Sequence, residues 1–139
     1  MKNKFEKYII QLCQEIRRIM FLHEQTIFYN FNYDKQDRQI NSKVGAEINI
    51  NTTYLRYTIT VFDVVFQVYK DKDTYQIIET LVHEHCHHFI DPIYFFGVRG
   101  VNNQTGEFLE ETRERQVQRI TNVIMGLLGK KFINEFQIK

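Results

Sequence analysis

Hydrophobic positions recur at helical spacing near the start of the chain. Residues 4–22 place apolar side chains three and four positions apart, which predicts an amphipathic helix with one buried face. The apolar positions are Phe5, Tyr8, Ile9, Leu12, Ile16, Ile19 and Met20. We interpret this face as ordinary hydrophobic core.

The middle of the chain changes to alternation of apolar and polar residues. Residues 26–33, 44–50 and 54–62 alternate in this way, which predicts three strands. Residues 63–69 form an apolar run that fits a further strand or a short helix equally well. We therefore expect a small sheet of three to four strands.

Helical spacing returns in the segment that precedes Pro92. Its apolar stripe consists of Ile78, Leu81, Val82, His85 and Phe89. This spacing predicts a helix with its back in the core and its flank free for other contacts. Asp73 or Thr74 can cap the start of the helix, and Pro92 is expected to end it.

The pattern after Pro92 is first irregular and then helical again. Residues 92–106 are expected to form an irregular segment, which either covers a cleft or is a plain surface loop. Residues 107–128 predict a final helix, which Gly129 is expected to stop. The inner line of that helix is predicted to be Arg113, Val117, Ile120, Ile124 and Leu127. These elements predict a single α+β domain over residues 1–139.

Composition places the chain among globular proteins and excludes several classes of partner. Of its 139 residues, 43% are hydrophobic and 14% are aromatic, which suffices for a buried core. A net charge of +1 gives no electrostatic case for nucleic acid or for an anionic membrane surface, and no apolar run is long enough to span a bilayer. Residues 1–7 are basic, but the polar residues that follow do not fit a signal peptide. The two cysteines, Cys13 and Cys86, favour a reduced, cytoplasmic protein over a disulfide scaffold.

The candidate chemistry lies in the helix before Pro92, where residues 83–87 spell His-Glu-x-x-His. Four residues make about one helical turn, so His83 and His87 project from one face and can share a zinc ion. Glu84 lies on the flank of that face, where it can take the proton of a zinc-activated water. The pattern predicts hydrolysis of an amide bond. The alternative is a helix with polar surface histidines or a loose metal-binding tract.

A catalytic zinc site needs a third protein ligand. The acidic opening of the last predicted helix is the obvious source, and it contains Glu107, Glu110, Glu111 and Glu114. Glu110 and Glu114 lie one turn apart, beside the inner line of the helix. The alternative is that these glutamates only complement the helix dipole.

Residues 80–89 resemble the active-site helix of small zincin metallopeptidases. The ImmA/IrrE-like and SprT-like groups and small phage-encoded relatives are the most similar. In the ImmA/IrrE-like group the third ligand is a glutamate on the next helix, somewhat over twenty residues after the second histidine. The resemblance therefore implies a gluzincin-like site with Glu114 as the third ligand and Glu110 and Glu111 as alternates. SprT-like proteins use a histidine where this chain has Gln104 and Thr105, which counts against a SprT-like site.

The resemblance extends over residues 54–128 and implies a minimal zincin-like fold. That fold has an N-terminal helix, a small sheet, the site helix and a C-terminal helix that bears the glutamate. Zincins commonly hold an extended substrate chain along an edge strand, and residues 54–62 are the candidate for it.

The function expected from these patterns is that of a zinc-dependent metallopeptidase acting on a protein or peptide substrate. Its cofactor is Zn²⁺, held by His83, His87 and Glu114, and its general base is Glu84. The alternative is a non-catalytic zincin-fold protein that acts as a metal-binding or protein-binding regulator. Asp91 lies two turns after His83 and is expected either to orient a ligand imidazole or to be a plain helix-terminal residue.

Three residues near the motif are expected to have minor roles. His85 points away from the metal face and is predicted to be packed or half exposed. His88 is predicted either to support the site from outside or to lie on the surface. Cys86 is expected to be a small packing residue beside the site, with a role as a metal ligand as the alternative.

Overall fold

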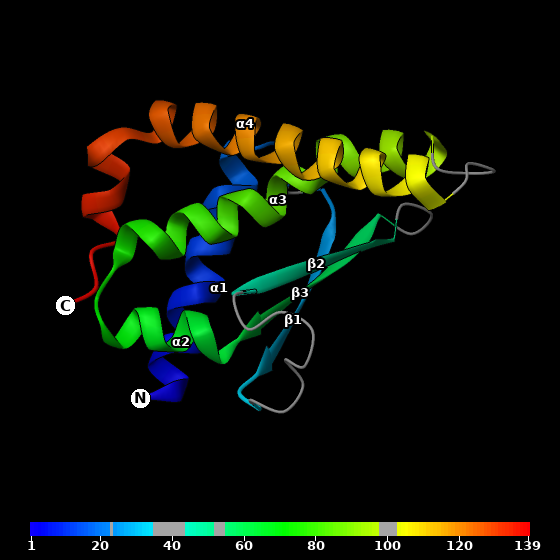
Figure 1. Ribbon diagram of the computed structural model, residues 1–139. Helices are drawn as coiled ribbons and strands as arrows, with labels where there is room; N and C mark the ends of the chain where they lie inside the picture. Colours follow the sequence, from blue (N-terminus) through cyan, green and yellow to red (C-terminus); the bar gives the residue numbers. More distant parts are fainter. Residues whose placement is uncertain (23, 35–43, 52–54, 98–102) are drawn as a thin grey trace.

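The computed structural model describes residues 1–22, 24–34, 44–51, 55–97 and 103–139. Within these residues the chain forms four helices and three strands (Figure 1). They are α1 (Lys2–Ile19), β1 (Thr26–Asn32), β2 (Ala46–Asn51), β3 (Arg56–Phe62), α2 (Asp63–Lys70), α3 (Thr74–Gly97) and α4 (Asn103–Glu135). The predicted α+β class is confirmed, and the ambiguous run after β3 is the helix α2. No helix among these residues has the length and apolar character that crossing a membrane requires.

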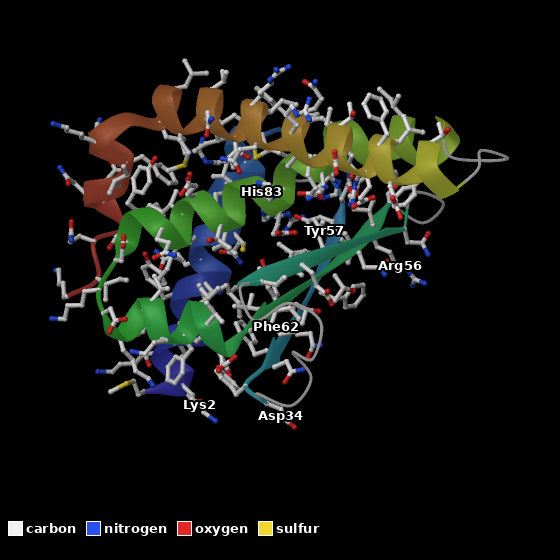
Figure 2. The ribbon with its side chains drawn as sticks, viewed as in Figure 1. Lys2, Asp34, Arg56, Tyr57, Phe62 and His83 are labelled. Atoms are coloured by element: carbon white, nitrogen blue, oxygen red, sulfur yellow. The ribbon has the colours of Figure 1, made fainter. Side chains whose placement is uncertain are left out.

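The sheet has the strand order β1-β3-β2, with β1 parallel and β2 antiparallel to β3. Figure 2 labels Arg56 and Phe62 at the two ends of β3. Because β3 pairs on both sides, the prediction that residues 54–62 form an edge strand is wrong for the described part of that segment. Tyr54 lies outside the described residues. Among the described strands, β2 is an edge, and it lies beside α3 (Figure 1).

One hydrophobic core joins the sheet to all four described helices. The inward residues of β3 are almost fully buried, as the alternation predicted, and they pack against the inner faces of α1 and α3. The buried members from these elements include Phe5, Ile9, Leu12, Ile16, Tyr57, Ile59, Val61, Ile77, Ile78, Leu81 and Val82. Burying each large aliphatic side chain contributes about 1.5–3 kcal/mol, so the back of α3 is firmly held. Phe89 is the one residue of the predicted apolar stripe that is not buried, with 45% of its surface exposed.

Helix α3 starts and ends differently from the prediction. The side chain of Asp73 accepts a hydrogen bond from the backbone N–H of Gln76 at 3.0 Å, so Asp73 is the cap. The expected end at Pro92 is wrong, because α3 continues to Gly97. Proline inside a helix lacks an N–H donor and costs about 3 kcal/mol. The next turn is nevertheless held against α4, because the rings of Tyr94 and Phe95 pack on the guanidinium of Arg113 at 5.1 and 5.7 Å.

Helix α4 packs along α3 and covers the remaining side of that helix (Figure 1). It begins at Asn103, so residues 92–97 and 103–106 are helical rather than irregular, while residues 98–102 lie outside the description. Gly129 breaks the helix with a φ of 65°, a left-handed conformation that favours glycine, which confirms the predicted stop. A further helical stretch follows it.

The inner line of α4 is partly as predicted. Val117, Thr121 and Met125 are buried at four-residue steps, whereas Leu127 is 80% exposed, so its predicted place in the line is wrong. The reason is that steps of four from Val117 rotate the buried line away from position 127.

Candidate metal centre

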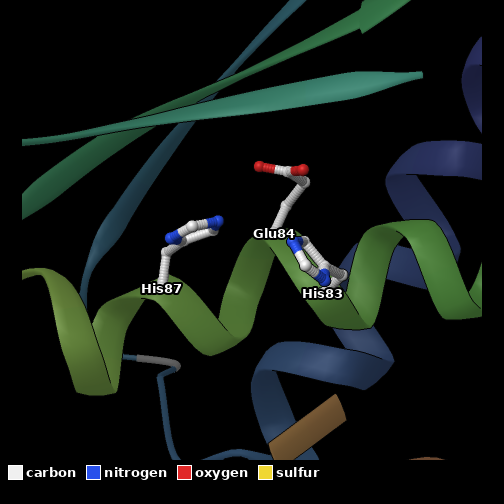
Figure 3. A group of neighbouring side chains, drawn as sticks. All are labelled: His83, Glu84 and His87. Carbon is white, nitrogen blue, oxygen red and sulfur yellow. The ribbon is translucent and has the colours of Figure 1, made fainter. Parts of the chain in front are cut away.

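The three motif residues lie together on the flank of α3 that borders the cleft. One ligand atom from each of His83, Glu84 and His87 lies within 4.8 Å of the other two. The two imidazole rings have centroids 5.3 Å apart, and the Glu84 carboxylate points toward the sheet (Figure 3). The one-turn spacing of the histidines and the buried back of α3 together produce this arrangement.

Glu114 approaches the same two histidines from α4. Its Oε2 lies 3.3 Å from His83 Nε2, and its Oε1 lies 3.7 Å from His87 Nε2. The Glu114 carboxylate thus approaches both imidazoles, with one oxygen near each ring, whereas Glu84 lies beside the two rings on the same helix. Two imidazole nitrogens and a carboxylate oxygen are a donor set that zinc accepts. The predicted residues His83, Glu84, His87 and Glu114 are therefore brought together.

The two alternate ligands are placed less favourably. Glu110 also borders the cleft, but its Oε1 accepts a 2.7 Å hydrogen bond from Arg113. Glu111 is exposed and has no hydrogen bond or ion pair among the described residues. Glu114 is the only one of these three that contacts either histidine within the described part of the chain.

Each histidine is oriented by a polar side chain behind it. His87 Nδ1 donates to Asp91 Oδ1 at 2.9 Å, and both side chains are about 5% exposed. His83 Nδ1 donates to Gln118 Oε1 at 3.2 Å. Both Nε2 atoms face Glu114, and His83 Nε2 donates to Glu114 Oε2 at 3.3 Å, so a metal bound there would take the place of that proton. The first of the two predictions for Asp91, that it orients an imidazole, is the one that the structure bears out in geometry.

Two contributors were not found from the sequence. Gln118 lies one turn after Glu114 on α4, and Arg113 binds Asp91 through Nε at 2.7 Å and through a terminal nitrogen at 3.0 Å. A signal for Arg113 was present, because a charged residue in a predicted buried line needs a partner.

The cluster borders a cleft of about 800 Å³ between α3, α4 and the edge strand β2. Strand β2 contributes Ala46, Glu47 and Ile48 to its wall, opposite the motif residues. Figure 2 shows His83 on α3, between the sheet and α4. The candidate metal ligands therefore face a space large enough for several residues of a bound peptide.

Electrostatics differ between the two glutamates of the site. Burial raises the pKa of Glu84 to about 7, although the neighbouring His87 and His83 lower it. The hydrogen bond with His83 is the main cause that holds the pKa of Glu114 below its ordinary value. At neutral pH Glu114 is therefore a carboxylate, while Glu84 can both accept and release a proton.

The Asp91 carboxylate is kept charged despite its burial. Burial raises the pKa of Asp91, but the hydrogen bonds from His87 and Arg113 outweigh it and leave the pKa below its ordinary value. Burial on its own lowers the pKa of His83. The hydrogen bond with Glu114 and the negative charges of Glu84 and Glu114 outweigh burial, so the pKa of His83 is raised.

The other residues of the motif region lie on the core side of α3. His85 is fully buried and donates from Nδ1 to the carbonyl of Leu81 at 2.7 Å, which confirms that it is packed. Burial lowers its pKa to about 4. His88 is partly buried with its ring centroid 4.4 Å from that of Tyr57, so it faces β3 rather than the cleft. Cys86 is buried, as predicted.

Comparisons with protein-family models, curated protein sequences and solved structures find no match for this chain.

Proposed function

We propose that this protein is a zinc-dependent peptidase that hydrolyses peptide bonds in the cleft between α3, α4 and β2. The observation that carries the proposal is the position of Glu114, with its two oxygens 3.3 and 3.7 Å from the Nε2 atoms of His83 and His87. In the proposed site these three residues hold Zn²⁺ and leave one position open, as catalytic zinc sites do.

Glu84 is the proposed general base. When bound, zinc polarises the scissile carbonyl and makes the attacking water more acidic. Glu84 takes the proton of that water and then passes it to the leaving amine. A carboxylate beside the two proposed histidine ligands is placed to accept that proton and to release it again.

The proposed substrate is an extended segment of a protein or peptide. Strand β2 is an edge among the described strands, and its residues 46–48 line the cleft. An extended chain can pair with such an edge through its main chain, which gives affinity without requiring a particular sequence. This places the expected substrate strand along β2 instead of β3.

We also propose a reducing, cytoplasmic setting for the protein. Cys13 and Cys86 are both buried and free, which fits a compartment where thiols stay reduced.

Metal content and metal-dependent hydrolysis test the proposal directly. We expect the purified chain to hold about one zinc per molecule after dialysis, because a site with three protein ligands binds zinc tightly. We expect it to cleave an unstructured, fluorescently quenched protein substrate, with activity lost on chelation and restored by added zinc. Failure to bind any divalent metal tightly, measured by elemental analysis, would refute the peptidase proposal.

Glu114→Ala is expected to weaken zinc binding on the order of 100-fold or more, because it removes one of three ligands, and structural zinc sites bind with about 10–16 kcal/mol in total. Competition with a chromophoric chelator measures the affinity. Glu111→Ala is the matched control, since Glu111 is an exposed neighbour on the same helix, and it should bind zinc as the unmodified chain does. Full retention of affinity in Glu114→Ala would move the third ligand to Glu110 or Glu111.

A further inference from the structure

We propose that Arg113 is a positioning residue that fixes His87 of α3 and Glu114 of α4 relative to each other, so that the two helices present one preformed metal site. The inference rests on the proposed zinc site, but it concerns a side chain that contacts no metal. It assigns Arg113 a role that neither the motif nor the helical pattern indicates.

The first link runs from Arg113 to His87 through Asp91. Arg113 donates to both oxygens of Asp91, from Nε to Oδ1 at 2.7 Å and from a terminal nitrogen to Oδ2 at 3.0 Å. Asp91 Oδ1 also accepts the Nδ1–H of His87 at 2.9 Å. A carboxylate that forms a bidentate hydrogen bond with a guanidinium is restrained from rotating. The imidazole that this carboxylate orients is therefore held in one direction.

The second link runs from the same guanidinium to the carboxylates of α4. The other terminal nitrogen of Arg113 lies 2.7 Å from Glu110 Oε1 and 3.4 Å from Glu114 Oε1. That Glu114 oxygen is the one that lies nearest to His87 Nε2. One cation therefore contacts both the group that orients a histidine and the carboxylate expected to bind the same metal.

Arg113 is itself held in place. Its side chain is 16% exposed, and the rings of Tyr94 and Phe95 lie against the guanidinium. Both rings come from the last turns of α3, beyond Pro92. The continuation of α3 past the proline thus supplies the wall that keeps Arg113 directed at Asp91.

Lysine cannot replace this arrangement. A guanidinium donates several N–H groups in a fixed plane, whereas an ammonium group is a point charge on a flexible stem. Arg113→Lys keeps the positive charge near the carboxylates but loses the two-pronged contact with Asp91, so it separates positioning from simple charge compensation.

The test measures zinc affinity and the visible spectrum of the cobalt-substituted full chain, without requiring activity. We expect Arg113→Lys and the isosteric Asp91→Asn each to weaken zinc binding by about 10 to 100-fold, the usual effect of losing a group that orients a metal ligand. The cobalt spectrum should shift, because the directions of the ligands change. Arg119→Gln is the control on the same helix, since Arg119 is exposed and has no partner among the described residues, and it should change neither readout.

The double variant distinguishes positioning from general stabilisation. Because the link from Arg113 to His87 runs through Asp91, the affinity loss in the double variant should be clearly smaller than the two single losses combined. Unchanged zinc affinity in both single variants, or fully additive losses in the double variant, would overturn the inference. Should Arg113→Lys not fold, Asp91→Asn alone decides, because unchanged affinity there breaks the first link. Absence of zinc binding by the unmodified chain would instead refute the proposed function.

Discussion

Replacing Glu84 by Gln is expected to abolish peptide hydrolysis while leaving zinc affinity nearly unchanged. Glutamine has the shape of glutamate but cannot accept the proton of the attacking water. General-base catalysis contributes about 100 to 10,000-fold, so kcat should fall by a factor in that range. Glu84 lies beside the two imidazoles, whereas Glu114 contacts both of them, so Glu84→Gln should change zinc affinity far less than Glu114→Ala does.

The matched control for this variant is Glu79→Gln. Glu79 lines the same cleft from the same helix, one turn before His83, and has no hydrogen-bond or ion-pair partner among the described residues. It should retain kcat to within a small factor. Steady-state cleavage of the quenched substrate gives kcat, and chelator competition gives zinc affinity for both variants.

Three outcomes of the Glu84 experiment separate the rival functions. Loss of turnover with zinc retained supports the peptidase. Loss of zinc as well would make Glu84 a ligand, in keeping with its place in the compact cluster with His83 and His87. A chain that binds zinc and a protein partner equally well with Glu84→Gln, and never cleaves, would be the non-catalytic regulator instead.

The parts of the structure that were predictable depend on local spacing. The buried face of α1, the alternation in β3 and the back of α3 follow from repeats of 3.6 and 2 residues, which act within one element. The proximity of His83, Glu84 and His87 is equally local, because one helical turn fixes it. Glu114 was reached differently, through a family resemblance that implied a spacing between two helices.

The parts that were missed depend on how elements pair. Alternation identifies a strand but does not tell whether it lies in the centre or at the edge of a sheet, and so β3 was mistaken for the edge that β2 provides. The end of α3 was misplaced because the contacts that hold residues beyond Pro92 come from Arg113, on another helix. The sequence also does not tell how α3 and α4 align, and so the hydrogen bonds from Arg113 to Asp91 could not be predicted.

The hydrogen bond between His87 and Asp91 preorganises the proposed metal site, which the three ligands alone would not do. A histidine held by a buried carboxylate already points its Nε2 at the cleft before a metal arrives, so little side-chain entropy is lost on binding. The site is then expected to be largely preformed in the metal-free chain. Removal of His87 should accordingly remove both a ligand and this preorganisation.

His87→Ala is therefore expected to eliminate the stabilisation that zinc gives to the fold. At a free zinc concentration about 100 times the dissociation constant, binding stabilises a folded protein by about 2.7 kcal/mol. The unmodified chain should show that increase in its free energy of unfolding, and His87→Ala should show almost none at the same zinc concentration. Chemical denaturation with and without zinc measures the difference for each protein.

His88→Ala is the matched control, because His88 is the adjacent residue and packs on Tyr57 of β3 instead of facing Glu114. It should lose stability without zinc, through the loss of that packing, yet gain as much from zinc as the unmodified chain. An equal zinc-dependent gain in His87→Ala would mean that the metal binds elsewhere. The two adjacent histidines thus separate two roles, because His88 packs against the sheet and His87 is expected to bind the metal.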